Sequence, residues 1–143
     1  MIVLITILCP DKAALHSIAS ALDKLNIRYI KEAVAVLVES ATVDIGICDS
    51  SDAAALLYFK TEGIPVITCG MGAKNTLTLS SFNDGTALIT VQRELPFLSG
   101  GGEKPEEFSV HFEGDSSPFA VMAVFAVEHL AGPALRDGDQ GQT

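Results

Sequence analysis

Two hydrophobic patterns open the chain and predict a buried strand followed by a helix. Residues 2–8 form a nearly continuous run of Ile, Val and Leu, which is typical of a strand covered on both faces. From Ala14 to Leu25, apolar side chains recur at spacings of three and four, which predicts an amphipathic helix. Asp11 is placed to cap the start of this helix, and Asn26 is placed to end it.

The alternation of strand and helix continues through the first half. Residues 43–48 and 64–68 are short apolar runs that predict two further buried strands. Between them, residues 53–61 predict a helix that begins after the Ser and Asp residues at 49–52 and ends at Gly63. Strands joined by right-handed helical crossovers run in the same direction, so this part of the chain predicts a largely parallel sheet.

The segment between these patterns fits more than one structure. Residues 27–30 can begin a second strand or form a short extended link. Residues 32–39 combine Ala and Val with a Glu at each end, and they fit either a buried helix or a strand. The alanines and the flanking charges favour the helix.

After Gly70 the pattern becomes that of antiparallel strands. Residues 75–82 and 86–93 both alternate between apolar and polar side chains, and Asn83-Asp-Gly85 between them is a turn of the hairpin type. Residues 108–112 form a third short strand, in which Phe and Val alternate with Ser and His. The second half therefore adds antiparallel strands to the sheet.

A glycine-rich loop and a buried helix complete the second half. Residues 95–105 contain three consecutive glycines and two prolines, which predicts an exposed loop. Ser117 can cap a helix whose first position is Pro118, where the missing N–H does no harm. Residues 119–130 are apolar nearly all round, so this helix should be buried, and Gly132-Pro133 should end it.

Together these patterns predict an α/β, three-layer Rossmann-like fold. Its mostly parallel sheet is extended by antiparallel strands in the C-terminal half. Residues 1–135 are expected to form a single domain, because a chain of 143 residues can bury one core without further support. Residues 136–143 are polar and rich in glycine, which predicts a disordered tail.

Composition and charge narrow the classes of function. The formal net charge of −9 argues against nucleic-acid binding, which needs clustered Lys and Arg, and disfavours an anionic membrane surface. The apolar N-terminal run is far shorter than the ~20 residues that span a bilayer, and it lacks the basic segment of a signal peptide. Three cysteines without tight spacing favour reduced thiols. We therefore expect a cytoplasmic protein.

Three segments follow one another in an order that is typical of a known family. Ile47-Cys-Asp-Ser-Ser-Asp52 follows one strand, and Ile67-Thr-Cys-Gly70 ends the next. Residues 108–127 then combine a strand, a glycine and a helix rich in Ala and Val. This succession, over roughly residues 43–131, resembles the latter part of the central domain of the Mur ligases, ATP-dependent enzymes that add amino acids to peptidoglycan precursors. The matching family motifs are N-x-D-D, I-T-[YF]-G and G-x-H-N-x-x-N-x-x-A-A.

The nucleotide-binding parts of that family are missing here. The family has a P-loop, G-x-x-G-K-[ST]-[ST], near the start of the domain, whereas the first strand of this chain leads into Cys9-Pro-Asp-Lys12. A phosphate cradle needs glycines so that backbone N–H groups can point inward, together with a Lys and a hydroxyl. Asp115-Ser116 stands in place of the family's His-Asn pair. The resemblance thus implies a ligase core without its ATP machinery, so we expect no cofactor and no ligase activity.

The segment from Gly70 to Thr76 is an alternative candidate for a phosphate loop. It offers two glycines, Lys74 and a threonine. However, Ala73 occupies the place of the glycine before the lysine, and the segment leads into a strand, so no helix dipole is offered to a phosphate. A tight turn with a surface lysine, which can meet a phosphate or carboxylate as a point charge, is the favoured interpretation.

The carboxyl ends of parallel strands are where open α/β sheets bind ligands. Three of the predicted strands end at a cysteine, and two of these cysteines are followed by acidic residues. The thiols could form a soft-metal site or a reactive centre, but buried structural cysteines are the favoured explanation, because no Cys-x-x-Cys or paired His supports a metal. The candidate ligand-binding residues are Cys9, Asp11, Cys48, Asp49, Asp52, Cys69, Gly70, Gly72 and Lys74.

Three functions stay open on the sequence. The first is a non-catalytic, Mur-ligase-like binding or regulatory domain without its own ATP site, which recognises a small molecule or a protein. The second is a small enzyme with Cys48 or Cys69 as nucleophile and Asp49 as helper. The third is a self-assembling protein, a homodimer for example, in which the hairpin at 75–93 supplies a strand edge for pairing. The three histidines lie on separate elements, and no catalytic residue can be assigned.

Overall fold

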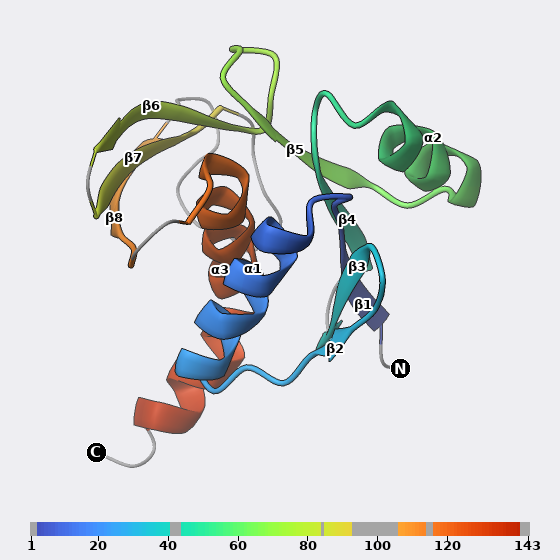
Figure 1. The fold of residues 1–143 in the computed structure, drawn as a ribbon. Helices are drawn as coiled ribbons and strands as arrows, with labels where there is room; N and C mark the ends of the chain where they lie inside the picture. The colour runs from blue at the N-terminus through green and yellow to red at the C-terminus, as the bar shows by residue number, and fades with distance from the viewer. Residues whose placement is uncertain (1–2, 41–43, 84, 93–105, 114–115, 141–143) are drawn as a thin grey trace.

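The computed structural model describes residues 3–40, 44–83, 85–92, 106–113 and 116–140, the last ten as backbone. Within these residues, eight strands form one mixed sheet in the order β2-β3-β1-β4-β5-β6-β7-β8, and three helices pack on it (Figure 1). The chain therefore has an α/β fold. The elements are β1 (Val3–Leu8), α1 (Lys12–Lys24), β2 (Ile30–Lys31), β3 (Ala35–Ser40), β4 (Ile45–Asp49), α2 (Ala53–Glu62), β5 (Val66–Gly70), β6 (Leu77–Asn83), β7 (Thr86–Val91), β8 (Glu106–His111) and α3 (Pro118–Gln140).

The first strand and helix form as the sequence predicts. In β1, Ile5 and Ile7 are fully buried on the same face of the sheet. The carboxylate of Asp11 caps α1, and the backbone turns out of the helix at Asn26, which has a left-handed φ of 59°. Asparagine tolerates that conformation better than most residues, so it is well suited to end a helix.

The helix predicted for residues 32–39 is wrong, because the segment from Ala35 onward forms β3. β3 runs antiparallel beside β1, with Val38 opposite Ile5, and the short β2 pairs along its other side. Val36 and Val38 are buried against the main core, whereas Glu39 is exposed. Burial at every second position and the stiff, β-branched valines therefore outweigh the helix propensity of the alanines.

The sheet is parallel in its centre alone. The pairs β1–β4, β4–β5 and β5–β6 are parallel. The other four pairs of described strands are antiparallel. The prediction of a mostly parallel sheet is therefore wrong, since β3 returns beside β1 as a strand. α2 joins β4 to β5 as predicted and ends at Gly63, whose φ of 69° is left-handed.

The predicted hairpin forms between β6 and β7, with Gly85 (φ 78°) in its turn. β7 pairs along its whole length with β8, whereas β6 pairs with β5 at Leu77 and Thr78 and, among the described strands, its residues 79–83 pair with β7 alone. The outermost described strand at this end is β8. Self-assembly through the hairpin at 75–93 stays a prediction, and the predicted loop at 95–105 lies outside the described residues.

The helices cover the two faces of the sheet unequally. α1 and α3 lie side by side on one face and enclose the main core, which contains Ile5 and Ile47 (Figure 1). α2 packs on the other face of β4, over a small cluster of Cys48, Ala55 and Phe59. A Cβ on Gly46 would lie 2.4 Å from the Phe59 ring, so the absence of a side chain there lets α2 approach the sheet.

α3 begins where the sequence predicts and ends later. The Oγ of Ser117 accepts a hydrogen bond from the N–H of Ala120 at 3.2 Å, and Pro118 is the first helical residue. The helix continues through Gly132-Pro133 to Gln140, so its predicted end is wrong, while the disordered tail at 136–143 stays a prediction. A proline removes one hydrogen bond within a helix, which can nevertheless continue beyond it. No described helix is long and apolar enough to cross a membrane.

Candidate functional site

The predicted site lies at the carboxyl ends of β1, β4 and β5. These strands are neighbours in the sheet, and α1 and α2 both begin at this end. In the β4–β5 register, Asp49 lies opposite Cys69. Asp49 ends β4, and Asp11 and Asp52 cap the two helices that begin at this end of the sheet. The structure therefore brings the predicted strand-end residues to one edge.

The carboxylates at this edge already have backbone partners. Asp11 accepts hydrogen bonds from the N–H groups of Ala13 and Ala14 at 2.9 and 3.4 Å, at the start of α1. Asp52 accepts from the N–H of Ala55 at 3.1 Å, at the start of α2. Both helices therefore begin with an internal anion on the amides that would otherwise bind a phosphate.

Asp49 is held by the turn that follows β4. Its Oδ1 accepts hydrogen bonds from the N–H and the hydroxyl of Ser51, at 2.8 and 2.7 Å. This arrangement shapes the connection between β4 and α2. Structural hydrogen bonding thus accounts for Asp49.

The three cysteines are buried and divided between the two faces of the sheet. Cys9 and Cys69 belong to the main core, whereas Cys48 lies beneath α2. Burial, followed by the charges of Asp52 and Asp49, raises the pKa of Cys48 to about 12. Burial and nearby negative charge also raise the pKa of Cys69 and of Cys9. These surroundings disfavour the thiolate, which is the nucleophilic and metal-binding form.

The glycine turn after β5 is closed by packing. A Cβ on Gly70 would lie 2.6 Å from the Oγ of Ser50 and 2.7 Å from the Nδ2 of Asn75. Asn75 is buried, and its amide donates a hydrogen bond to the carbonyl of Gly72 at 2.9 Å. Gly70 is thus needed for close packing, and Lys74 lies exposed on the same turn. Within the described residues, no group of three His, Cys, Asp or Glu side chains could hold a metal ion.

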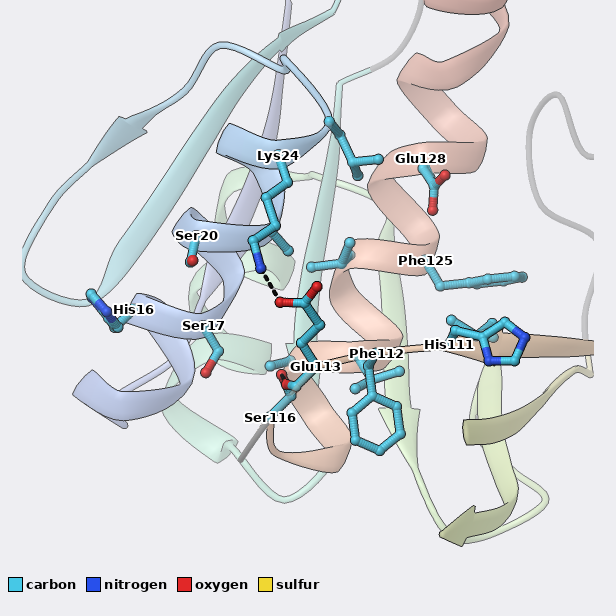
Figure 2. A pocket seen from close by; sticks show the side chains of 16 residues that line it. His16, Ser17, Ser20, Lys24, His111, Phe112, Glu113, Ser116, Phe125 and Glu128 are labelled. Atoms are coloured by element: carbon cyan, nitrogen blue, oxygen red, sulfur yellow. Dashed lines mark hydrogen bonds and ion pairs between the residues drawn. The ribbon is translucent and has the colours of Figure 1, made fainter. Parts of the chain in front are cut away.

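A second region, which the sequence did not indicate as a site, is a groove between α1, β8 and α3 (Figure 2). Its volume is about 600 Å³, within the range of roughly 300–1,000 Å³ that is usual for small-molecule sites. Polar side chains alternate with apolar ones around it. The lining residues are His16, Ser17, Ser20, Ala21, Lys24, Leu25, Val110, His111, Phe112, Glu113, Ser116, Ala120, Val121, Val124, Phe125 and Glu128.

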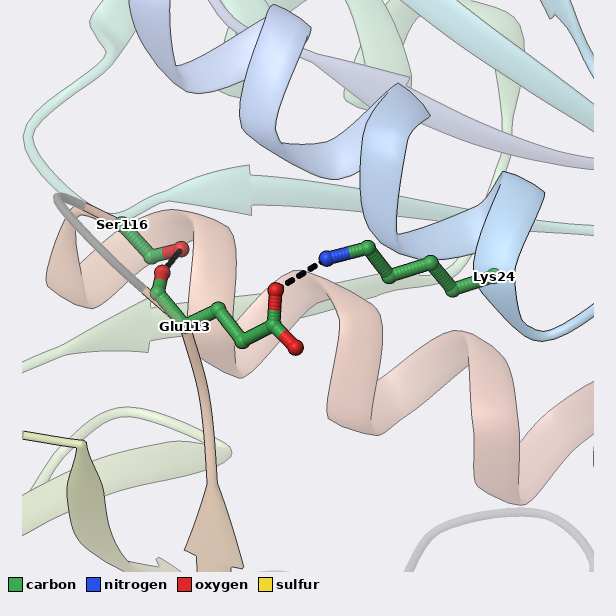
Figure 3. A network of polar contacts seen from close by, with 3 residues as sticks. All are labelled: Lys24, Glu113 and Ser116. Carbon is green, nitrogen blue, oxygen red and sulfur yellow. Dashed lines mark hydrogen bonds and ion pairs between the residues drawn. The ribbon is translucent and has the colours of Figure 1, made fainter.

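An ion pair joins the two walls of this groove. Lys24 reaches from α1 and Glu113 from the segment after β8, and their charged groups meet between the two elements (Figure 3). The side chains are 58% and 79% exposed. The hydrogen bond and then the charge of Lys24 lower the pKa of Glu113. The backbone of Glu113 is held in turn by Ser116, whose Oγ donates to its carbonyl oxygen at 3.0 Å.

One pattern in the sequence partly indicates this groove. Ser17, Ser20 and Lys24 recur at spacings of three and four on the polar side of the first predicted helix. That pattern marks a shared helix face, but it does not say which strand lies opposite. Sequence comparison does not place the chain in a family: no protein-family model, curated protein or solved structure matches it.

Proposed function

We propose that this chain is a non-catalytic binding or regulatory domain with a three-layer, Rossmann-like core of the Mur-ligase kind and no ATP site of its own. The order of elements from β4 to α3 supports the relationship. A strand, a helix and a second strand are followed by a hairpin, a further strand and a long helix. This is the succession that the resemblance implies.

The observation that carries the proposal is the turn between β1 and α1. In a P-loop protein this turn wraps the phosphates with glycine N–H groups. Here it consists of Cys9, Pro10 and Asp11, and the Asp11 carboxylate occupies the first free amides of α1. A triphosphate at this position would meet a fixed negative charge, and proline supplies no N–H. The scaffold is therefore unsuited to ATP at the place where the family binds it.

A catalytic thiol is the weaker alternative. The nucleophile of such an enzyme must be deprotonated and reachable. Cys48 and Cys69 are both 0% exposed, and burial together with the nearby charge of Asp49 raises the pKa of both thiols. A binding role needs neither condition.

Calorimetric titration and thermal-shift measurements would test the proposal on the intact protein. We expect no saturable heat and no rise in the melting temperature with ATP and Mg²⁺, and no release of inorganic phosphate. A muramyl-peptide precursor that raises the melting temperature without being consumed would support the Mur-ligase relationship. Tight, magnesium-dependent ATP binding would overturn the proposal, because the β1–α1 turn would then hold a triphosphate.

A further inference from the structure

The groove between α1, β8 and α3 is lined by charged, hydroxyl and apolar side chains. Lys24, Glu113 and Glu128 come from three different segments, and the hydroxyls of Ser17 and Ser20 lie on the α1 side (Figure 2). The remaining surface includes Leu25, Val121, Val124 and Phe125, which also pack on the main core. A ligand that fits this surface combines an apolar body with charged groups.

The charged side chains of the groove favour some ligand charges over others. The lining contains one lysine and two glutamates, and the whole chain has a formal charge of −9. A simple anion would pair with Lys24 but displace Glu113 from it, leaving two carboxylates beside a third negative group. A ligand with both signs of charge can instead give its anion to Lys24 and its cation to Glu113, so both charges of the protein stay paired.

The ion pair between Lys24 and Glu113 is suited to such an exchange. Both side chains are largely exposed, and exposed pairs contribute little to stability because water screens them and two long side chains lose freedom. Opening this pair is therefore cheap compared with opening a buried one. Once this pair opens, the groove presents one positive and one negative group to a ligand.

We propose that the groove binds a small zwitterion with an apolar body: a free α-amino acid with a branched or aromatic side chain, or a dipeptide of such residues. Its carboxylate pairs with Lys24 and accepts hydrogen bonds from Ser17 or Ser20. Its ammonium group pairs with Glu113 and with Glu128 on α3. Its side chain lies on Val121 and Val124. The inference rests on the proposed binding role, for which it names the ligand class, but it does not depend on the relationship to Mur ligases.

Amide chemical-shift mapping on the intact protein would test this inference. The probes are L-phenylalanine, L-leucine and the dipeptide Leu-Leu, and the matched controls are N-acetyl-L-phenylalanine, which lacks the cation, and L-phenylalaninamide, which lacks the anion. We expect saturable shifts in α1, β8 and the first half of α3 with the zwitterions. Removing either charge should weaken the affinity by roughly tenfold.

Variants connect the binding to the two charged residues. Lys24→Met and Glu113→Gln are each expected to remove the preference for the zwitterion. Lys60→Met removes a lysine from α2, far from the groove lining, and should leave binding unchanged. Both groove residues are exposed, so the variants should fold, and a melting curve of each confirms it. No shifts at millimolar ligand, shifts outside the groove, or unaltered binding by Lys24→Met would overturn the inference.

The two proposals fail separately. If ATP binds at the β1–α1 turn, the proposed function falls, while shifts in the groove still report on the zwitterion site. If neither ATP nor any zwitterion binds, the ligand class and the groove are wrong, and the absence of a nucleotide site still holds.

Discussion

The strand-end edge has reactive residue types that are already engaged or buried, whereas the α1–β8–α3 groove has ordinary residue types around an open volume. At the edge, reactive residue types are abundant, but Asp11, Asp52 and Asp49 are engaged with backbone and the thiols are buried. In the groove the residue types are ordinary, yet charged side chains face an open volume of about 600 Å³. The difference shows that residues with catalytic potential do not make a site when the fold uses them for capping and packing.

The largest expected effect is slow alkylation at the edge. The rise in the pKa of Cys48 from 9.0 to about 12 lowers its thiolate fraction at neutral pH by about a thousandfold. Iodoacetamide should therefore label the folded protein far more slowly than free cysteine, and mass spectrometry would follow the modification. Protein unfolded in urea is the control, in which all three thiols should react. One thiol that reacts faster than free cysteine would restore the nucleophile hypothesis and reverse the comparison.

The raised pKa of Cys48 also predicts how the stability of the protein changes with pH. A raised pKa means that the folded protein holds the proton more tightly than the unfolded chain does. The stabilisation is complete below the unfolded pKa of Cys48, near 9.0, and is lost as the pH rises toward about 12. Urea denaturation midpoints should consequently fall above pH 9, and a Cys48→Ala variant should show a smaller fall.

A smaller effect is expected from filling the closed turn at the edge. A methyl group on Gly70 meets Ser50 and Asn75 at less than 3 Å, so Gly70→Ala should lower the free energy of unfolding by about 1–3 kcal/mol. Gly72→Ala is the matched control, since its nearest neighbour would lie at 3.8 Å. Urea denaturation compares the two. Equal stability of both variants would mean that this turn has room for a ligand after all.

The smallest effect concerns the cap of α1. Asp11→Ala removes the hydrogen bonds to Ala13 and Ala14 and should cost about 1 kcal/mol of stability, whereas Asp11→Ser keeps a capping oxygen and should cost less. Chemical denaturation measures both. If Asp11→Ala is as stable as the parent, the carboxylate is not needed for capping, and a binding role for Asp11 becomes the better explanation.

Local sequence signals were sufficient to predict where several helices begin or end. Asp11, Asn26 and Gly63 act through their own side chain or backbone conformation, so their roles can be predicted without knowing the fold. Residues 32–39 are different, because β1 supplies the partner that turns an ambiguous segment into a strand. The helix through Pro133 likewise continues past a residue that usually predicts an end.

The groove could not be predicted for a related reason. Lys24 and Glu113 are 89 residues apart in the sequence, and their meeting depends on how α1, β8 and α3 pack. Each residue alone reads as a solvated surface charge. The clustering of the strand-end residues could be predicted from the sequence, because the carboxyl ends of neighbouring parallel strands lie at the same edge of a sheet. Whether such residues are available for chemistry is decided by burial and hydrogen bonding.

Gly46 lets Phe59 pack against β4, and this contact anchors α2 in a small cluster that is separate from the main core. α2 rests on a few buried side chains, and its Leu57 and Tyr58 are 65% and 48% exposed, whereas α1 and α3 share one continuous interior. Such a weakly anchored helix can detach while the rest of the domain stays folded. Amide hydrogens of α2 would then exchange with solvent before those of β1, and Cys48 would become the first thiol to meet a reagent.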